Sequence, residues 1–307
     1  MDPKDFIKRL REFLESKNFS SLEEINWTIK EFIEMENNTP LEKFCGLSPY
    51  KMWRLVNFPF DSPDVISFNT NALPPLDAPF VKLFILLIKG IHDAKGLKAT
   101  VAGNLPRDFC RELERTYLPE EDLKFFSRDK FPIIREQDFP DLHRVRVVAE
   151  MAGYIRKYKK RFVLTERGRK LVERSFTIDN YSHLFKTFAL KYNWAYFDFF
   201  DEIDIIQDSF LFTLYLLQIF GNEFRSKEFY ANKFSAAFSL ILKSIPPDSR
   251  FDTSTEKEIK NAYIHRAINL FAIAWGFAKT EKNLPYSGRF SENVRKTNFL
   301  DEFIKLA

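Results

Sequence analysis

Glycine is scarce in this chain, with 9 residues among 307, whereas phenylalanine is abundant, with 35. A chain with few glycines has few positions for tight turns and left-handed backbone, and it suits long helices. Phenylalanine fills the interiors between such helices. Hydrophobic residues make up 45% of the chain and charged residues 29%, which is typical of a folded protein and not of a disordered one. We therefore expect a mainly α-helical protein with an aromatic core.

The length of 307 residues is sufficient for two or three domains. Prolines are dense between residues 58 and 79 and predict a linker or a surface loop there. We predict a helical region over residues 1–75, a central domain over 76–175 and a C-terminal helical domain over 176–307. No internal repeat is evident. In the C-terminal part, the apolar spacing predicts only helices, over 181–198, 206–220, 226–244 and 256–279.

Positive charge is concentrated between residues 142 and 174. This block has eleven Lys or Arg against three Glu, a net charge of +8, whereas the whole chain carries only +4. Charge segregated in this way produces a local field that favours a polyanion.

The central domain has a recognisable order of expected elements. An almost wholly apolar run predicts a buried helix, and Thr165 is a good N-cap for the last helix. The segment 154–165 has two interpretations, a β-hairpin around Lys159-Lys160 or a continuation of the preceding helix. The predicted elements are a helix over 80–91, an extended segment over 96–100, helices over 104–117 and 142–152, the segment 154–165, and a helix over 166–173.

This order, with the run LTERGR at residues 164–169, resembles the winged helix, a helix-turn-helix variant common in bacterial transcription regulators. The resemblance implies that Leu164 points into the core, that Thr165 caps the next helix and that Gly168 allows helix and hairpin to approach closely. It covers residues 78–174. Two features depart from the pattern: an insertion over 118–140, and a hairpin tip without the usual Asn-Gly or Asp-Gly.

The same resemblance implies a nucleic-acid interface in two parts. Residues 142–152 would be the recognition helix, and the hairpin would be the wing that contacts phosphates or a minor groove. The residues implied in binding are His143, Arg144 and Arg146 on the helix, and Lys157, Lys159, Lys160 and Arg161 on the wing.

The whole chain is also similar to a group of uncharacterised bacterial proteins. The segments that carry this resemblance are 46–64, 96–113 and 209–223. It implies a shared architecture and no particular chemistry.

Residues for catalysis are harder to find. The sequence has no phosphate-binding loop, no dinucleotide fingerprint and no nucleophile elbow, so we assign no catalytic residue, no metal site and no cofactor. The best alternative is an acidic cluster over 198–208, whose carboxylates would suit Mg²⁺ if they converged. Carboxylates near a helix start are also an ordinary structural feature.

The remaining features indicate the cellular setting. Cys45 and Cys110 lack a metal or disulfide pattern and are expected as reduced, buried thiols in a cytoplasmic protein. No apolar run reaches the length needed to cross a bilayer. The sequence therefore predicts a cytoplasmic bacterial protein without enzymatic activity that binds DNA or RNA through its basic central domain. Two alternatives stay open: a protein-interaction or scaffold role, and a metal-dependent enzyme.

Overall fold

The computed structural model of the chain is mainly helical, as the sequence predicts, and it contains a few small antiparallel sheets where the sequence predicts at most one β-hairpin. It describes residues 3–128, 130–245, 255–282, 284–285 and 287–307. Among these residues, no helix combines the length and the apolar character needed to cross a membrane.

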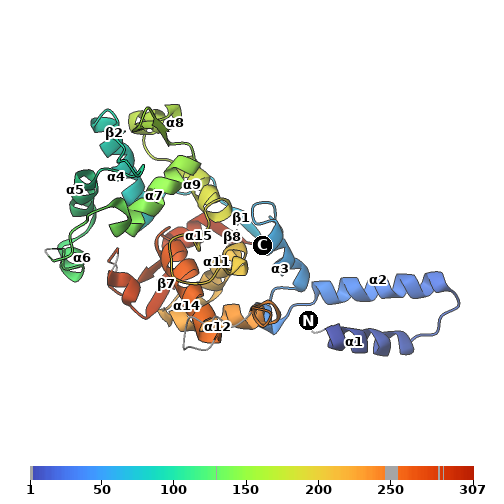
Figure 1. Cartoon of the computed structure of the whole chain (residues 1–307). Helices are drawn as coiled ribbons and strands as arrows, with labels where there is room; N and C mark the ends of the chain where they lie inside the picture. Colours follow the sequence, from blue (N-terminus) through green and yellow to red (C-terminus); the bar gives the residue numbers. More distant parts are fainter. Residues whose placement is uncertain (1–2, 129, 246–254, 283, 286) are drawn as a thin grey trace.

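The chain begins with a two-helix arm that projects from the rest of the molecule (Figure 1). Helix α1 (Pro3–Glu15) packs on α2 (Leu22–Asn38) through Phe13, whose ring centroid lies 5.1 Å from that of Phe32. Ser21 caps α2 by accepting a hydrogen bond from the backbone N–H of Glu24. Helix α3 (Pro49–Asn57) follows, capped by Ser48.

The proline-dense segment is not free of regular structure. Its prolines flank a short strand, β1 (Ile66–Phe68), which pairs with β8 (Ile304–Leu306) at the other end of the chain. Most of the buried apolar residues form one cluster that includes residues from all three predicted sections. Many of the phenylalanines lie in it, as expected. The ring of Phe185, for example, packs against the rings of Phe210, Phe271 and Phe277.

The central section forms what we call the first helix–sheet unit, residues 79–165. Its hairpin settles the interpretation of residues 154–165, because β3 and β4 pair in register from Ile155 with Leu164 to Tyr158 with Arg161. Strand β2 pairs on the other side of β4, so the sheet order is β2-β4-β3. The elements are α4 (Pro79–Asp93), β2 (Leu97–Lys98), α5 (Arg107–Tyr117), α6 (Glu120–Phe125), η2 (Glu136–Asp138), α7 (Pro140–Met151), β3 (Ile155–Tyr158) and β4 (Arg161–Leu164), followed by α8 (Glu166–Glu173).

The C-terminal section is not all helix, and this part of the prediction is wrong. Its described strands, β8 among them, contain two to four residues each, too few for a recognisable alternation of apolar and polar side chains. The predicted helix over 181–198 ends at Leu190, and Asn193 then accepts a hydrogen bond from the N–H of Ala195 in a turn. The elements are α9 (Ile178–Leu190), α10 (Asp204–Asp208), α11 (Phe210–Phe220), β5 (Arg225–Ser226), α12 (Lys227–Ala237), α13 (Ser239–Leu242), α14 (Thr255–Tyr263), the π-helix η3 (Ile264–Ile273), β6 (Ala278–Thr280), η4 (Ser287–Phe290), β7 (Asn293–Lys296) and α15 (Asn298–Phe303).

Residues 210–297 form a second helix–sheet unit that repeats the first. In both units a helix leads to a short strand, then to further helices, and then to two strands that pair with each other. The sheet orders correspond, β2-β4-β3 and β5-β7-β6. The registers also correspond: Leu97 pairs with Phe162 and Lys98 with Arg161, as Arg225 pairs with Val294 and Ser226 with Asn293.

The turn before each pair of strands repeats hydrogen bond for hydrogen bond. Gly153 has φ +71° and Gly276 has φ +82°, a left-handed conformation that favours glycine. The hydroxyl of Thr165 donates to the carbonyl of Gly153 at 2.7 Å, and that of Thr297 donates to the carbonyl of Gly276 at 2.6 Å. The sequence shows no repeat because few side-chain identities are shared, whereas the backbone arrangement is duplicated.

Candidate functional site

The hairpin of the first unit closes in a two-residue turn at Lys159 and Lys160. Both residues have positive φ, +47° and +59°, which is the geometry that Asn-Gly usually supplies. Left-handed backbone costs an ordinary L-residue roughly 1–2 kcal/mol. The tip of this hairpin is therefore strained, and the strain places two ammonium groups there.

The hairpin cations face solvent. Arg156, Lys157, Lys159, Lys160 and Arg161 are all exposed. In the part of the chain that the structure describes, none of them is ion-paired to a carboxylate, although Arg161 donates a hydrogen bond to the carbonyl of Gly96 at 2.6 Å. Since no carboxylate among the described residues neutralises their charge, these groups are available to an anion.

The sheet presents an outer face that combines cations with one aromatic ring. Tyr158 and Arg161 are direct cross-strand partners and lie on the same face as Arg156, two residues before Tyr158. Lys98 of β2 pairs with Arg161 and continues this row. The Tyr158 side chain is 51% exposed. We call these four residues the outer sheet face.

The predicted recognition helix is not a surface in this structure. His143, Arg144 and Arg146 of α7 are 3%, 7% and 6% exposed, so the expectation that they would face a ligand is corrected. The insertion over 118–140 is one cause, because its Glu136 lies against α7. Glu136 accepts hydrogen bonds from His143 Nδ1 at 2.7 Å and from Arg146 Nε at 2.8 Å.

Glu136 is the centre of a buried ionic network. Burial alone would raise the pKa of Glu136, but hydrogen bonding to His143 and the charge of Arg146 hold that pKa below its usual value. Its other oxygen accepts the N–H of Leu105 at 2.5 Å. Arg146 also pairs with Glu150 at 2.5 Å. The charges of α7 are thus neutralised by acids of the same chain.

The second unit covers the start of α7. Asp141 accepts from Arg144 at 2.9 Å and from both terminal nitrogens of Arg289, at 3.0 and 2.9 Å. Arg289 lies in the segment between β6 and β7, so this ion pair joins the two units. Ser287, in the same segment, donates its N–H to Asp122 of α6 at 2.8 Å. The insertion of the first unit and the longer strand connection of the second therefore contact each other.

The acidic cluster over 198–208 does not converge on a metal position. Asp198 is held by Arg266, with Nε and Nη2 donating to its two oxygens at 2.7 and 2.9 Å. Asp204 and Asp208 lie on the short helix α10. Within the described residues, no three His, Cys, Asp or Glu side chains are grouped to hold a metal ion.

The motif at 164–169 has the local roles that the sequence predicts. Leu164 is buried, and the hydroxyl of Thr165 accepts the N–H of Gly168 at the start of α8. A Cβ on Gly168 would lie 2.2 Å from the carbonyl oxygen of Tyr154, so only glycine allows this approach. Of the two thiols, Cys110 is fully buried, which raises its pKa to about 12, and Cys45 is half-buried.

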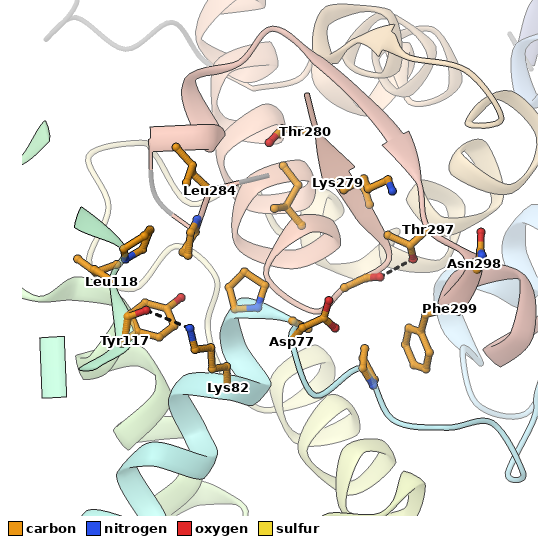
Figure 2. Close-up of a pocket in the computed structure, with 18 of the residues that line it drawn as sticks. Asp77, Lys82, Tyr117, Leu118, Lys279, Thr280, Leu284, Thr297, Asn298 and Phe299 are labelled. Carbon is orange, nitrogen blue, oxygen red and sulfur yellow. Dashed lines mark hydrogen bonds between the residues drawn. The ribbon is translucent and has the colours of Figure 1, made fainter. Parts of the chain in front are cut away.

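A cleft between the two units was not foreseen from the sequence. It has a volume of about 780 Å³, and Figure 2 shows it between the start of α4, the end of α5 and the strands of the second unit. Lys82 donates to the carbonyl of Tyr117 at 3.2 Å across one side. Its charged lining is balanced, with Lys82 and Lys279 against Asp77 and Glu302. No His or Cys is found among its described lining residues.

Comparison with known proteins places one part of the chain. No curated protein and no solved structure matches the chain. Of the three segments with a bacterial resemblance, only 96–113 lies inside the segment that matches a family model. The segment that matches the family model, residues 76–177, spans the first helix–sheet unit and α8. It is similar to the Y4jL N-terminal domain.

Proposed function

We propose that this protein binds nucleic acid without enzymatic activity and that the hairpin of the first unit contacts the sugar–phosphate backbone. One observation carries the proposal: five cationic side chains, from Arg156 to Arg161, are exposed together on a rigid hairpin, and none is neutralised by a carboxylate of the described chain. A phosphate backbone is the ligand that such an array binds most favourably. Each phosphate that is neutralised releases condensed counterions, and this release adds to the affinity.

The proposal includes a winged-helix assignment for the first unit. It is supported by the order of helices and strands, by the sheet order β2-β4-β3 and by the capping of α8 at Thr165. In this assignment residues 155–164 are the wing. Because His143, Arg144 and Arg146 are buried and bonded to carboxylates of the same chain, the proposed contacts are those of the wing alone: Lys157, Lys159, Lys160 and Arg161.

Contacts made by a wing without a recognition helix have a functional consequence. Backbone contacts position a protein on nucleic acid, whereas base edges supply sequence specificity. We therefore expect binding that depends strongly on salt and weakly on sequence.

The test is the salt dependence of the affinity for single-stranded and for duplex DNA, measured by fluorescence anisotropy. The variant K157A/K159A/K160A/R161A removes four cations from the wing. If all four contact phosphates, the slope of log affinity against log salt becomes shallower by about 3.6, at about 0.9 per phosphate.

The matched control is R11A/K30A/K191A/K243A, which removes four exposed cations elsewhere. This control should retain the parent slope. The proposal is wrong if the parent binds neither single-stranded nor duplex DNA, or if the wing and control variants have the same slope.

A protein partner is the second candidate function. It is favoured by an apolar groove of about 450 Å³ between the arm, α3 and α13. Trp53, Leu240 and Ile241 line it and are each about half exposed. Light scattering over a range of concentrations, for the parent and for Trp53→Glu, would detect self-association through this groove.

A further inference from the structure

The exposed ring of Tyr158 is not explained by contact with phosphates. It stands on the outer sheet face with cations around it: the guanidinium of Arg156 lies 5.3 Å from the ring centroid, and the ammonium of Lys159 lies 5.4 Å from it. Arg161 is its cross-strand partner. About half of this side chain is open to solvent at the end of a strand, just before the turn.

The position of Tyr158 differs from that of Phe162, the buried aromatic residue on the other face of the same sheet. Phe162 is fully buried; the ammonium of Lys157 lies 5.1 Å from its ring centroid and the guanidinium of Arg146 lies 5.7 Å from it. Tyr158 contributes no comparable burial to the core. Its ring is attached to a strand through a side chain with two rotatable bonds. The charged groups beside the ring, Arg156 and Lys159, are both cations.

An aromatic ring framed by cations has a specific use with nucleic acid. Bases stack on such rings while the cations hold the flanking phosphates, and any base is accepted because each has a π-face. In an intact duplex the faces of the bases are already stacked on each other, so a protein ring reaches them only at an unpaired position.

We propose that the outer sheet face binds nucleic acid at an unpaired base, which stacks on Tyr158 while Arg156, Arg161 and Lys98 hold the neighbouring phosphates. The preferred ligand is therefore a single strand or a single-stranded end, and not a continuous duplex. This inference rests on the proposed function, because it names the form of nucleic acid that the wing binds.

The test compares three proteins on two probes at one salt concentration. The proteins are the parent, Tyr158→Ala and Tyr158→Phe, and the probes are a fluorescently labelled 20-nucleotide single strand and the duplex of the same length. Loss of one stacked base should weaken single-strand binding about 5- to 150-fold in Tyr158→Ala. Tyr158→Phe retains the ring and should bind as the parent does.

A second readout detects stacking itself. A single strand with 2-aminopurine at successive positions should lose fluorescence on binding the parent and Tyr158→Phe, and keep it on binding Tyr158→Ala. Because half of the Tyr158 side chain is exposed, the melting temperatures of the three proteins should agree within a few degrees, which separates lost binding from lost folding.

The outcomes separate this inference from the function on which it rests. Equal affinity of the parent for both probes, or an equal effect of Tyr158→Ala on both, overturns the unpaired-base inference. In that case the proposed function still stands if the four-cation wing variant weakens binding. If the parent binds neither probe, the proposed function fails and the inference fails with it.

Discussion

Replacement of the hairpin tip by Asn-Gly should make the protein more stable and a weaker binder at once. In K159N/K160G, both positions keep their left-handed backbone, at φ +47° and +59°, but asparagine tolerates it and glycine adopts it without strain. Relief of roughly 1–2 kcal/mol per residue is partly offset by the greater freedom of glycine in the unfolded chain, about 0.5–1 kcal/mol. The net gain is about 1–3.5 kcal/mol.

The stability half of this prediction is measured by thermal or urea unfolding. For a chain of this size, about 1–3.5 kcal/mol corresponds to a rise in Tm of about 2–5 °C. The binding half is measured by anisotropy. Two lost phosphate contacts make the slope of log affinity against log salt shallower by about 1.8.

The matched control K159A/K160A removes the same two charges and keeps the strain, because alanine is disfavoured in left-handed backbone. It should lose binding to the same extent and gain no stability. If K159N/K160G is less stable than the parent, the left-handed turn is not the strained element described here. Unchanged binding in both variants would mean that the tip lysines do not touch the ligand.

Three further predictions concern the framework around the hairpin. Gly168→Ala should destabilise the fold by more than about 2 kcal/mol, because its Cβ would lie 2.2 Å from the carbonyl oxygen of Tyr154; urea unfolding measures the loss. Glu136→Gln should destabilise by about 3–5 kcal/mol, again by urea unfolding, because the charge of Arg146 loses its most buried partner. His265 has a pKa lowered to about 4, mainly by burial, so the unfolded chain binds its proton more readily; stability measured across pH should fall as pH decreases from about 6.5 to 4, by up to about 3 kcal/mol.

Each of these predictions has a comparison that checks the cause. Gly153→Ala meets no atom within 4 Å and should cost only about 1–2 kcal/mol for its left-handed backbone, so an equal loss in both glycine variants would contradict the clash. Glu150→Gln, at the more exposed end of the network, should cost less than Glu136→Gln. His265→Gln should flatten the stability profile between pH 6.5 and 4; an unchanged profile would assign the loss to other groups.

Most elements of the first unit could be predicted because their signals are local; α6 and η2, inside the insertion, could not. The apolar run of α4, the cap at Thr165 and the close approach at Gly168 each depend on residues within one or two turns. The hairpin was ambiguous because its tip lacks Asn-Gly. Lys159 and Lys160 adopt the turn despite its cost, and no local pattern predicts that.

The second sheet could not be predicted for a different reason. Strands β5 and β6 have two and three residues, and their partner β7 lies well apart in the sequence, beyond a strand connection longer than that of the first unit. The duplication is visible only in the registers and in the backbone hydrogen bonds of Gly153 and Gly276.

The candidate site was predicted in part because exposure depends on tertiary contacts. Charge counting identifies the basic block, but it does not distinguish Lys159, which faces solvent, from Arg146, which is buried against Glu136. Glu136 lies in the insertion over 118–140, which departs from the winged-helix pattern. The packing of that insertion on α7 determines which half of the predicted interface is accessible.

The most direct measurement of the central claim is lysine footprinting, in which acetylation rates are compared by mass spectrometry with and without a bound oligonucleotide. Lys157, Lys159 and Lys160 should become protected on binding, whereas the exposed Lys30 and Lys243 should react as before. Protection confined to lysines outside residues 155–161, with the three wing lysines unchanged, would contradict the account.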